Sequence, residues 1–198
     1  LATRDGGIWC TWDAGPKGPE RYALYPYLPG DVIDENYGPC TGGCTCTGGC
    51  ACAEERAAAF GRGIGGLHQA LNRLPRREAY PSMDLVGQLS GKVRETVLSE
   101  ITSPSPWLGA VYAVLEQELY PRYDELPQQL IHRDAHPGNM LFQDGGVVGV
   151  IDFEIATWGI RLFDLAYCST SLLSAAGDDA DRRARWPALL RALLDGYS

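Results

Sequence analysis

Residues 129–153 read QLIHRDAHPGNMLFQDGGVVGVIDF and contain the pattern that decides the fold. Short apolar segments of strand composition alternate here with polar residues. These segments are QLIH (129–132), NMLFQ (139–143) and VVGVIDF (147–153). Asp144-Gly145-Gly146 separates the last two and is typical of a hairpin turn. A hairpin this short would bring Asn139 and Asp152 side by side.

The polar residues of this stretch have the spacing of a phosphotransfer loop. His132-Arg133-Asp134 and Asn139 follow the pattern H-R-D-x-x-x-x-N, and Asp152 follows on the next strand. Transfer of a γ-phosphoryl group requires a carboxylate that accepts the proton of the attacking hydroxyl, and Mg²⁺ to bridge the phosphates. We expect Asp134 to be that base and Asn139 and Asp152 to be magnesium ligands, because hard cations prefer oxygen donors. Alone, either motif could be a strand edge whose carboxylate caps a turn.

Residues 130–154 resemble the aminoglycoside phosphotransferase and choline-kinase-like families, whose loop commonly reads H-x-D-x-H-x-x-N. The resemblance covers nearly the whole chain. It implies an α+β, protein-kinase-like fold, with a partial β-rich N-terminal lobe and a mostly helical C-terminal lobe. It also implies a small-molecule kinase that uses Mg²⁺ and either ATP or GTP. The acceptor would be a hydroxyl of an aminoglycoside, an amino alcohol or a similar small molecule.

The resemblance assigns supporting roles around the loop. His132 belongs to the motif, and His136 matches its second histidine, which would order the loop or be a buried structural residue. Asp164 resembles a buried aspartate that braces the loop, a role compatible with capping a helix. His68 resembles the Leu-His pair of the first large-lobe helix and is expected in the core. Because residues 153–163 run straight to Asp164, no room remains for the activation loop of a protein kinase.

The N-terminal part predicts a strand hairpin and a hinge. GGIWCTWD (6–13) and ERYALYPYL (20–28) have strand composition and are joined by the turn-forming DAGPKGP. YALYPYLPG (22–30) resembles the hinge between kinase lobes, where the Pro26 carbonyl and the Leu28 amide would meet the adenine. The alternative is an aromatic strand end with one face in the core.

The remaining chain predicts a linker and a helical lobe. We expect residues 1–30 to be an N-terminal lobe remnant, 31–53 a linker, and 54–198 the catalytic lobe. Within the linker, residues 40–53 contain only Ala, Cys, Gly and Thr, and read as nucleotide letters residues 40–51 (CTGGCTCTGGCA) would encode Leu-Ala-Leu-Ala. A frameshift, nucleotide text, a genuine repeat or a thiolate metal site all remain open. Helices are expected at 53–74, 83–101, 106–120, 163–176 and 178–197.

Composition excludes some partners and leaves one rival function. A net charge of −8 and a pI near 4.8 disfavour nucleic acid and anionic membranes as partners. No apolar run reaches the roughly 20 residues that span a bilayer, so we expect a soluble, cytoplasmic protein.

Nothing before the hairpin resembles the nucleotide lysine or the phosphate-covering loop, and Lys17 lies in a turn. We therefore expect a fragment truncated at both ends, with a non-catalytic kinase-like binding protein as the alternative. The oligomeric state remains open.

Overall fold

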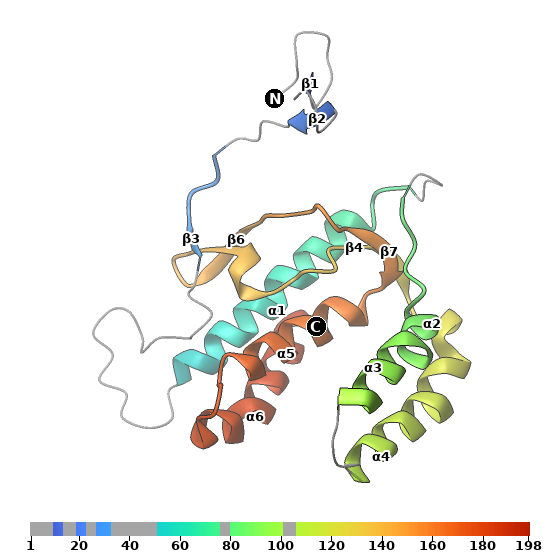
Figure 1. Cartoon of the computed structure of the whole chain (residues 1–198). Helices are drawn as coiled ribbons and strands as arrows, with labels where there is room; N and C mark the ends of the chain where they lie inside the picture. Colours follow the sequence, from blue (N-terminus) through green and yellow to red (C-terminus); the bar gives the residue numbers. More distant parts are fainter. Residues whose placement is uncertain (1–9, 14–18, 23–26, 33–50, 76–79, 101–105) are drawn as a thin grey trace.

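The computed structural model describes residues 10–13, 19–22, 27–32, 51–75, 80–100 and 106–198. Figure 1 shows a mainly helical body with small antiparallel sheets along one side of it. This arrangement confirms the predicted α+β class.

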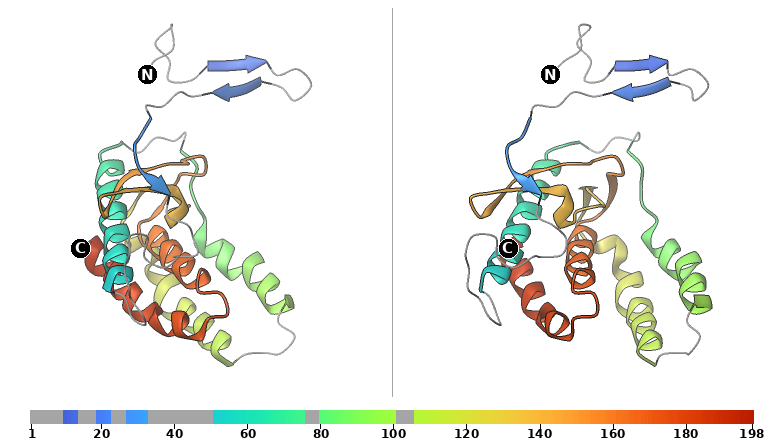
Figure 2. Two further views of the ribbon diagram at one scale, coloured as in Figure 1. Left: turned by 90° about the vertical axis from the view of Figure 1, so that its left-hand side faces the viewer. Right: turned by 60° about the vertical axis from the view of Figure 1, so that its left-hand side comes forward.

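The predicted N-terminal hairpin is present. Strand β1 (Cys10–Asp13) pairs antiparallel with β2 (Pro19–Tyr22), so that Asp13 faces Pro19. Figure 2 shows this hairpin standing apart from the helical body. Tyr27 and Leu28, expected at the end of the second strand, lie outside any strand and are exposed. Pro29 follows them directly, and proline cannot donate a ladder hydrogen bond.

A three-stranded sheet carries the central hairpin. Strand β5 (Met140–Gln143) pairs with β6 (Gly146–Val150), as predicted, although β6 ends before residues 151–153. The segment expected to be a linker begins with a short strand, β3 (Asp31–Val32), which pairs antiparallel with β5. A free strand edge offers unpaired backbone groups, and β3 satisfies those of β5. Residues 33–50 of the expected linker, with most of the Cys-rich run, lie outside the described residues, and residues 51–53 form the start of the following helix instead.

A second small sheet was not foreseen in full. Strand β4 (Gln128–Ile131) was predicted, but its antiparallel partner β7 (Thr157–Ile160) was not. Thr, Trp and Ile favour strands, yet the segment is short and contains a glycine, so its pattern is weak. Pairing with β4 is what makes it a strand.

The helices follow the predicted order with shifted ends. They are α1 (Ala51–Leu71), α2 (Leu85–Ser90), α3 (Lys92–Glu100), α4 (Pro106–Val114), α5 (Leu162–Ser174) and α6 (Ala180–Tyr197). The single helix expected at 83–101 is divided, because Gly91 has a non-helical backbone with φ −101° and ψ −112°. Beyond α4 the chain continues as a π-helical turn (Leu115–Leu119) and a 3₁₀ segment (Tyr120–Glu125). Among the described helices, none is both long and apolar enough to cross a membrane.

Two apolar clusters lie on either side of the sequence motif. The larger joins α1, β5, α5 and α6 through residues that include Phe60, Met140, Leu165 and Leu193. The smaller joins α2 to the β4–β7 sheet through Met83, Leu85, Ile131 and Ile160. Residues 132–139 connect β4 with β5, so the motif forms a bridge between the two clusters.

Glycines allow α1 and α6 to approach closely. A Cβ atom placed on Gly61 of α1 would collide with the carbonyl oxygen of Leu193, and one on Gly196 of α6 with that of Ala58. These obstacles are backbone atoms, which cannot move aside without separating the helices. Glycine is therefore required at this crossing.

Gly61→Ala is expected to lower the free energy of unfolding by about 1–3 kcal/mol, the range for overpacking a filled interior. Gly66→Ala is the matched control on the same helix, because nothing lies within 4 Å of its Cβ position. That change should be neutral or stabilise by up to about 1 kcal/mol through helix propensity. Urea unfolding followed by circular dichroism measures both. Equal stability of the two variants would show that the helices are not this close.

Candidate active site

The loop after β4 turns sharply at Arg133. Its φ of 71° is in the left-handed region, which is uncommon for a residue other than glycine. Such a conformation costs about 1–3 kcal/mol and persists where the surroundings impose it. The turn separates His132, which is buried, from Asp134, whose side chain is 24% exposed.

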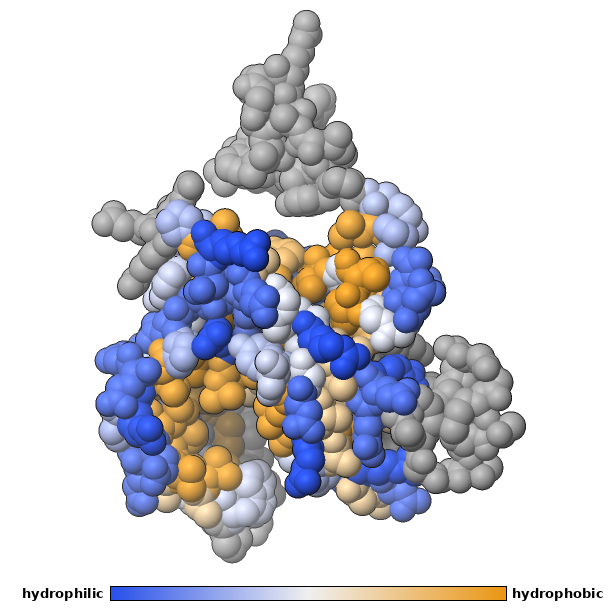
Figure 3. Space-filling model, turned by 180° about the vertical axis from the view of Figure 1, so that it is seen from behind, coloured by the Kyte–Doolittle hydropathy of each residue, from blue (hydrophilic) through white to orange (hydrophobic). Residues whose placement is uncertain are grey.

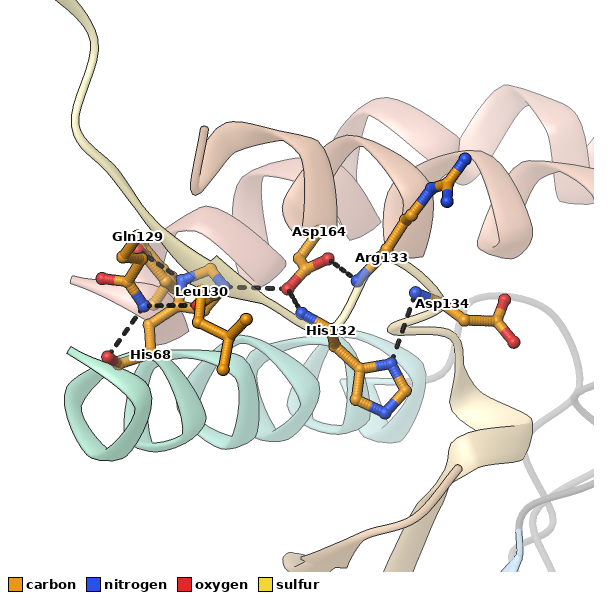
Figure 4. Close-up of polar contacts among 8 residues, drawn as sticks. His68, Gln129, Leu130, His132, Arg133, Asp134 and Asp164 are labelled. Atoms are coloured by element: carbon orange, nitrogen blue, oxygen red, sulfur yellow. Dashed lines mark hydrogen bonds and ion pairs between the residues drawn. The ribbon is translucent and has the colours of Figure 1, made fainter. Parts of the chain in front are cut away.

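Hydrogen bonds to Asp164 stabilise this turn. Its fully buried carboxylate accepts hydrogen bonds from the backbone N–H groups of His132 (2.9 Å) and Arg133 (2.7 Å). Its Oδ2 also lies 3.0 Å from Nε2 of His68 on α1. Figure 4 shows these contacts meeting at one carboxylate. Asp164 also lies in the first turn of α5, where the helix dipole favours a negative charge. The same residue therefore holds the loop and lies at the N-terminal end of a helix.

His132 ties the loop to the following strand. Its Nε2 lies 2.9 Å from the carbonyl oxygen of Ile151, and its Nδ1 accepts from the N–H of Asp134 at 3.3 Å. A carbonyl can only accept, so the proton of this imidazole is on Nε2. The ring also packs edge-on against Phe153, with centroids 4.6 Å apart. His132 therefore fixes Asp134 relative to the segment that contains Asp152.

Asn139 orients the Asp134 carboxylate. The Asn139 Nδ2 donates to both the backbone oxygen and Oδ2 of Asp134, at 3.0 Å each. His136 Nε2 lies 3.8 Å from the same Oδ2, while its Nδ1 accepts from the Gly138 N–H at 3.1 Å. His136 is thus partly exposed rather than buried. It caps the 3₁₀ turn Pro137–Asn139 and faces the carboxylate with its other nitrogen.

The arrangement fits the oxygen ligands that Mg²⁺ requires. The amide nitrogen of Asn139 is used in the hydrogen bonds to Asp134. The amide oxygen of the same side chain can therefore act as a metal ligand. The Ile151 N–H donates to the Asn139 carbonyl at 3.0 Å, which places Asp152 one residue from that contact. Asp152 is exposed and has a φ of 65°. Within the described residues no group of three or more His, Cys, Asp or Glu could hold a metal. A pair of oxygen ligands with waters and phosphates is nevertheless usual for Mg²⁺.

The predicted nucleotide contacts are only partly described. Pro26 lies outside the described residues. Leu28 is 43% exposed, and its Cδ1 would be 3.0 Å from a Cβ built on Gly149 of β6. Leu28 therefore lies over the β5–β6 hairpin whose end carries the site, and its contact with adenine stays a prediction.

Sequence reasoning missed Tyr197. This last residue of α6 lies with its hydroxyl 2.9 Å from Nδ1 of His68. The two residues are 129 positions apart, and no local pattern links them.

Cys168 is a thiol that lies near Asp164 in the core. Burial, with a smaller effect of the Asp164 charge, raises the pKa of this thiol to about 12, so it is not a nucleophile at neutral pH.

The chain belongs to the phosphotransferase enzyme family (APH), whose sequence profile matches residues 5–198. A homoserine kinase of Phenylobacterium zucineum is 32% identical over 138 residues, covering 69% of this chain and 40% of that protein. An uncharacterized protein of Deinococcus radiodurans is 26% identical over 198 residues, covering 97% of this chain and 51% of that protein.

Solved structures share the fold. The complex of amicoumacin kinase hAmiN with AMP-PNP, Ca²⁺ and Ami matches with a TM-score of 0.62 at 16% identity, covering 100% of this chain and 54% of that one. A microcompartment-associated aminopropanol kinase matches with a TM-score of 0.52 at 18% identity, covering 100% of this chain and 65% of that one. The predicted kinase-like fold is therefore confirmed. The chain spans about half the length of the curated relatives above.

Asp164→Asn is expected to lower the free energy of unfolding by about 2–3 kcal/mol, since it leaves buried donors without an acceptor. Its amide would also present N–H groups to the N–H groups of the loop. Asp178→Asn makes the same chemical change at an exposed ion pair with Arg183, and such pairs contribute little. Denaturant titration of both variants tests this. Equal midpoints would show that Asp164 does not hold the loop.

Proposed function

We propose that the complete protein is a kinase that transfers the γ-phosphoryl group of ATP or GTP to a hydroxyl of a small molecule. The observation that carries this proposal is the double hydrogen bond of Asn139 to Asp134. It joins the expected base to an expected metal ligand in one network. Membership of the phosphotransferase family supports the same reaction class. We further propose that the protein acts in the cytoplasm, where both nucleotides are available.

In the proposed reaction, Asp134 Oδ accepts the proton of the acceptor hydroxyl as its oxygen attacks the γ-phosphorus. A bond forms between that oxygen and phosphorus, and the bond from phosphorus to the β–γ bridging oxygen breaks. The nucleoside diphosphate leaves, and the proton passes from Asp134 to solvent. Asn139 and Asp152 would hold Mg²⁺, which supplies neutralisation of the phosphate charge. Asp164 and His132 keep Asp134 in place throughout.

We propose an amino alcohol or amino sugar as the acceptor. Relatives include proteins named homoserine kinase, and similar structures include an aminopropanol kinase and an aminoglycoside 2'-phosphotransferase. Aromatic rings extend from the base in support of this class. His136 and Tyr167 are edge to face at 6.2 Å, and Phe163 stacks on Tyr167 at 6.1 Å. Tyr167 is 39% exposed, and an aromatic face can attract an ammonium group.

Asp134→Asn should lower kcat by about 10²–10⁴-fold, the usual contribution of a general base. Asp144→Asn is the control, because Asp144 lies exposed at the hairpin tip with φ 51°, a conformation that asparagine tolerates. Turnover is measured as nucleotide consumption by the complete protein with homoserine, 1-amino-2-propanol and an aminoglycoside. Undiminished activity of Asp134→Asn would defeat the mechanism. Absence of turnover in the unaltered protein would favour a binding protein instead.

Asp152→Asn should raise the Mg²⁺ concentration needed for half-maximal activity by about tenfold or more, because a hard cation loses a charged ligand. The titration uses saturating nucleotide and acceptor. Glu154→Gln, two residues further along and also exposed, provides the comparison for a loss of charge nearby. An unchanged Mg²⁺ dependence in Asp152→Asn would remove Asp152 from the metal site.

A further inference from the structure

We propose that Tyr197 and His68 are positioning residues that set the geometry of the catalytic loop through Asp164. The expected effect on kcat rests on the proposed function. The expected effect on the hydrogen bonds of the loop does not. The residues form a chain of contacts from the last residue of α6, through α1, to the carboxylate that holds the loop. None of them touches the expected positions of substrate or metal, so each acts through the next.

The chain is continuous and buried at its centre. The Tyr197 hydroxyl lies 2.9 Å from His68 Nδ1, and His68 Nε2 lies 3.0 Å from Asp164 Oδ2. His68 is 2% exposed and Asp164 is fully buried. The Tyr197 ring also packs edge to face on the imidazole, with centroids 5.6 Å apart at 84°. Both the hydroxyl and the ring of Tyr197 therefore restrain His68.

The direction of each hydrogen bond follows from the donors available. The Asp164 carboxylate can only accept, so His68 must present N–H from Nε2. In the neutral imidazole Nδ1 is then an acceptor, and the Tyr197 hydroxyl donates to it. Burial raises the pKa of the Tyr197 hydroxyl, although the nearby Arg161 charge opposes the shift, so the hydroxyl keeps the proton that it donates. Each hydrogen bond in this chain therefore donates in the same direction, from Tyr197 to His68 and from His68 to Asp164.

His68 is also held from the β4 side. The amide nitrogen of Gln129, a residue of β4 that is 3% exposed, donates to the backbone oxygen of His68 at 2.9 Å. This contact fixes the backbone of α1 at His68 but does not hold the imidazole ring. The Tyr197 hydroxyl is therefore the contact that keeps Nε2 pointed at Asp164. Without it, the imidazole can turn or change tautomer and withdraw a donor from that carboxylate.

Tyr197→Phe tests this with the loss of one oxygen. In the complete protein, kcat should fall roughly fivefold, as expected for losing one hydrogen bond, while the KM for nucleotide stays within about twofold. Tyr123→Phe is the control, since the Tyr123 hydroxyl is buried and has no hydrogen-bond partner among the described residues. It should leave kcat unchanged. Equal kcat for Tyr197→Phe and the unaltered protein overturns the proposal.

A double-mutant cycle separates action through His68 from a general loss of packing. Glutamine at position 68 can place an amide N–H near Nε2 and still reach Asp164, but it offers no acceptor at the place of Nδ1. Tyr197→Phe should therefore have no further effect on kcat in a His68→Gln background. The same fold reduction in both backgrounds would show that Tyr197 acts independently of His68, and would overturn the proposal.

Amide hydrogen exchange distinguishes this inference from the proposed function. Exchange in a peptide covering residues 130–139 should be faster in Tyr197→Phe than in the unaltered protein or in Tyr123→Phe, because the loop N–H groups are held less firmly. This readout needs no turnover. If no acceptor is phosphorylated, the proposed function fails while faster loop exchange still supports the positioning role. Unchanged loop exchange overturns the positioning role even if the enzyme is active.

Discussion

The buried carboxylate of Asp164 is the constraint on which the rest of the site depends. A carboxylate without partners in the interior would cost far more free energy than a domain of this size can spare, so its acceptor positions must be filled. They are filled by the N–H groups of His132 and Arg133 and by His68. These donors come from different parts of the chain. The first turn of α5 therefore cannot pack without residues 132–139 and α1 in their observed positions.

The same interaction explains the backbone strain at Arg133, and hydrogen bonds of the neighbouring residue explain the strain at Asp152. Arg133 and Asp152 both have positive φ values, which side chains other than glycine rarely adopt. At Arg133 the N–H bond to Asp164 offsets the cost of the turn and directs Asp134 outward. Asp152 follows Ile151, which is itself held at both backbone groups, its N–H by Asn139 and its carbonyl by His132. Both strained residues thus lie next to hydrogen bonds that determine where the chain turns.

The sequence predicted those helices and strands that a local pattern of residues encodes. The β5–β6 hairpin follows from its turn residues and apolar alternation, and the order of the helices follows from their periodicity. β3 and β7 escaped prediction because each is a strand only through a partner distant in sequence, β5 and β4 respectively. Division of the helix at Gly91 depends on a single backbone conformation. For the site, the motif predicted Asp134, Asn139 and Asp152, and the family resemblance added Asp164. The structure brings the loop residues and Asp164 into contact. Tyr197 had no such signal, since its link to His68 exists only after α6 packs on α1.

The loop's place between two apolar clusters explains how a surface site can be rigid. Ile131, before the loop, is fully buried in the smaller cluster, and Met140, after it, is fully buried in the larger. Both ends of residues 132–139 are thus fixed by packing, and the backbone between them is fixed by Asp164. Little conformational freedom remains for Asp134 itself, because Asn139 Nδ2 holds its carboxylate as well as its carbonyl. A carboxylate that is already oriented loses less entropy on meeting a hydroxyl, which suits the role of base proposed for Asp134. Since the same asparagine is an expected metal ligand, any displacement of Asn139 would also move Asp134.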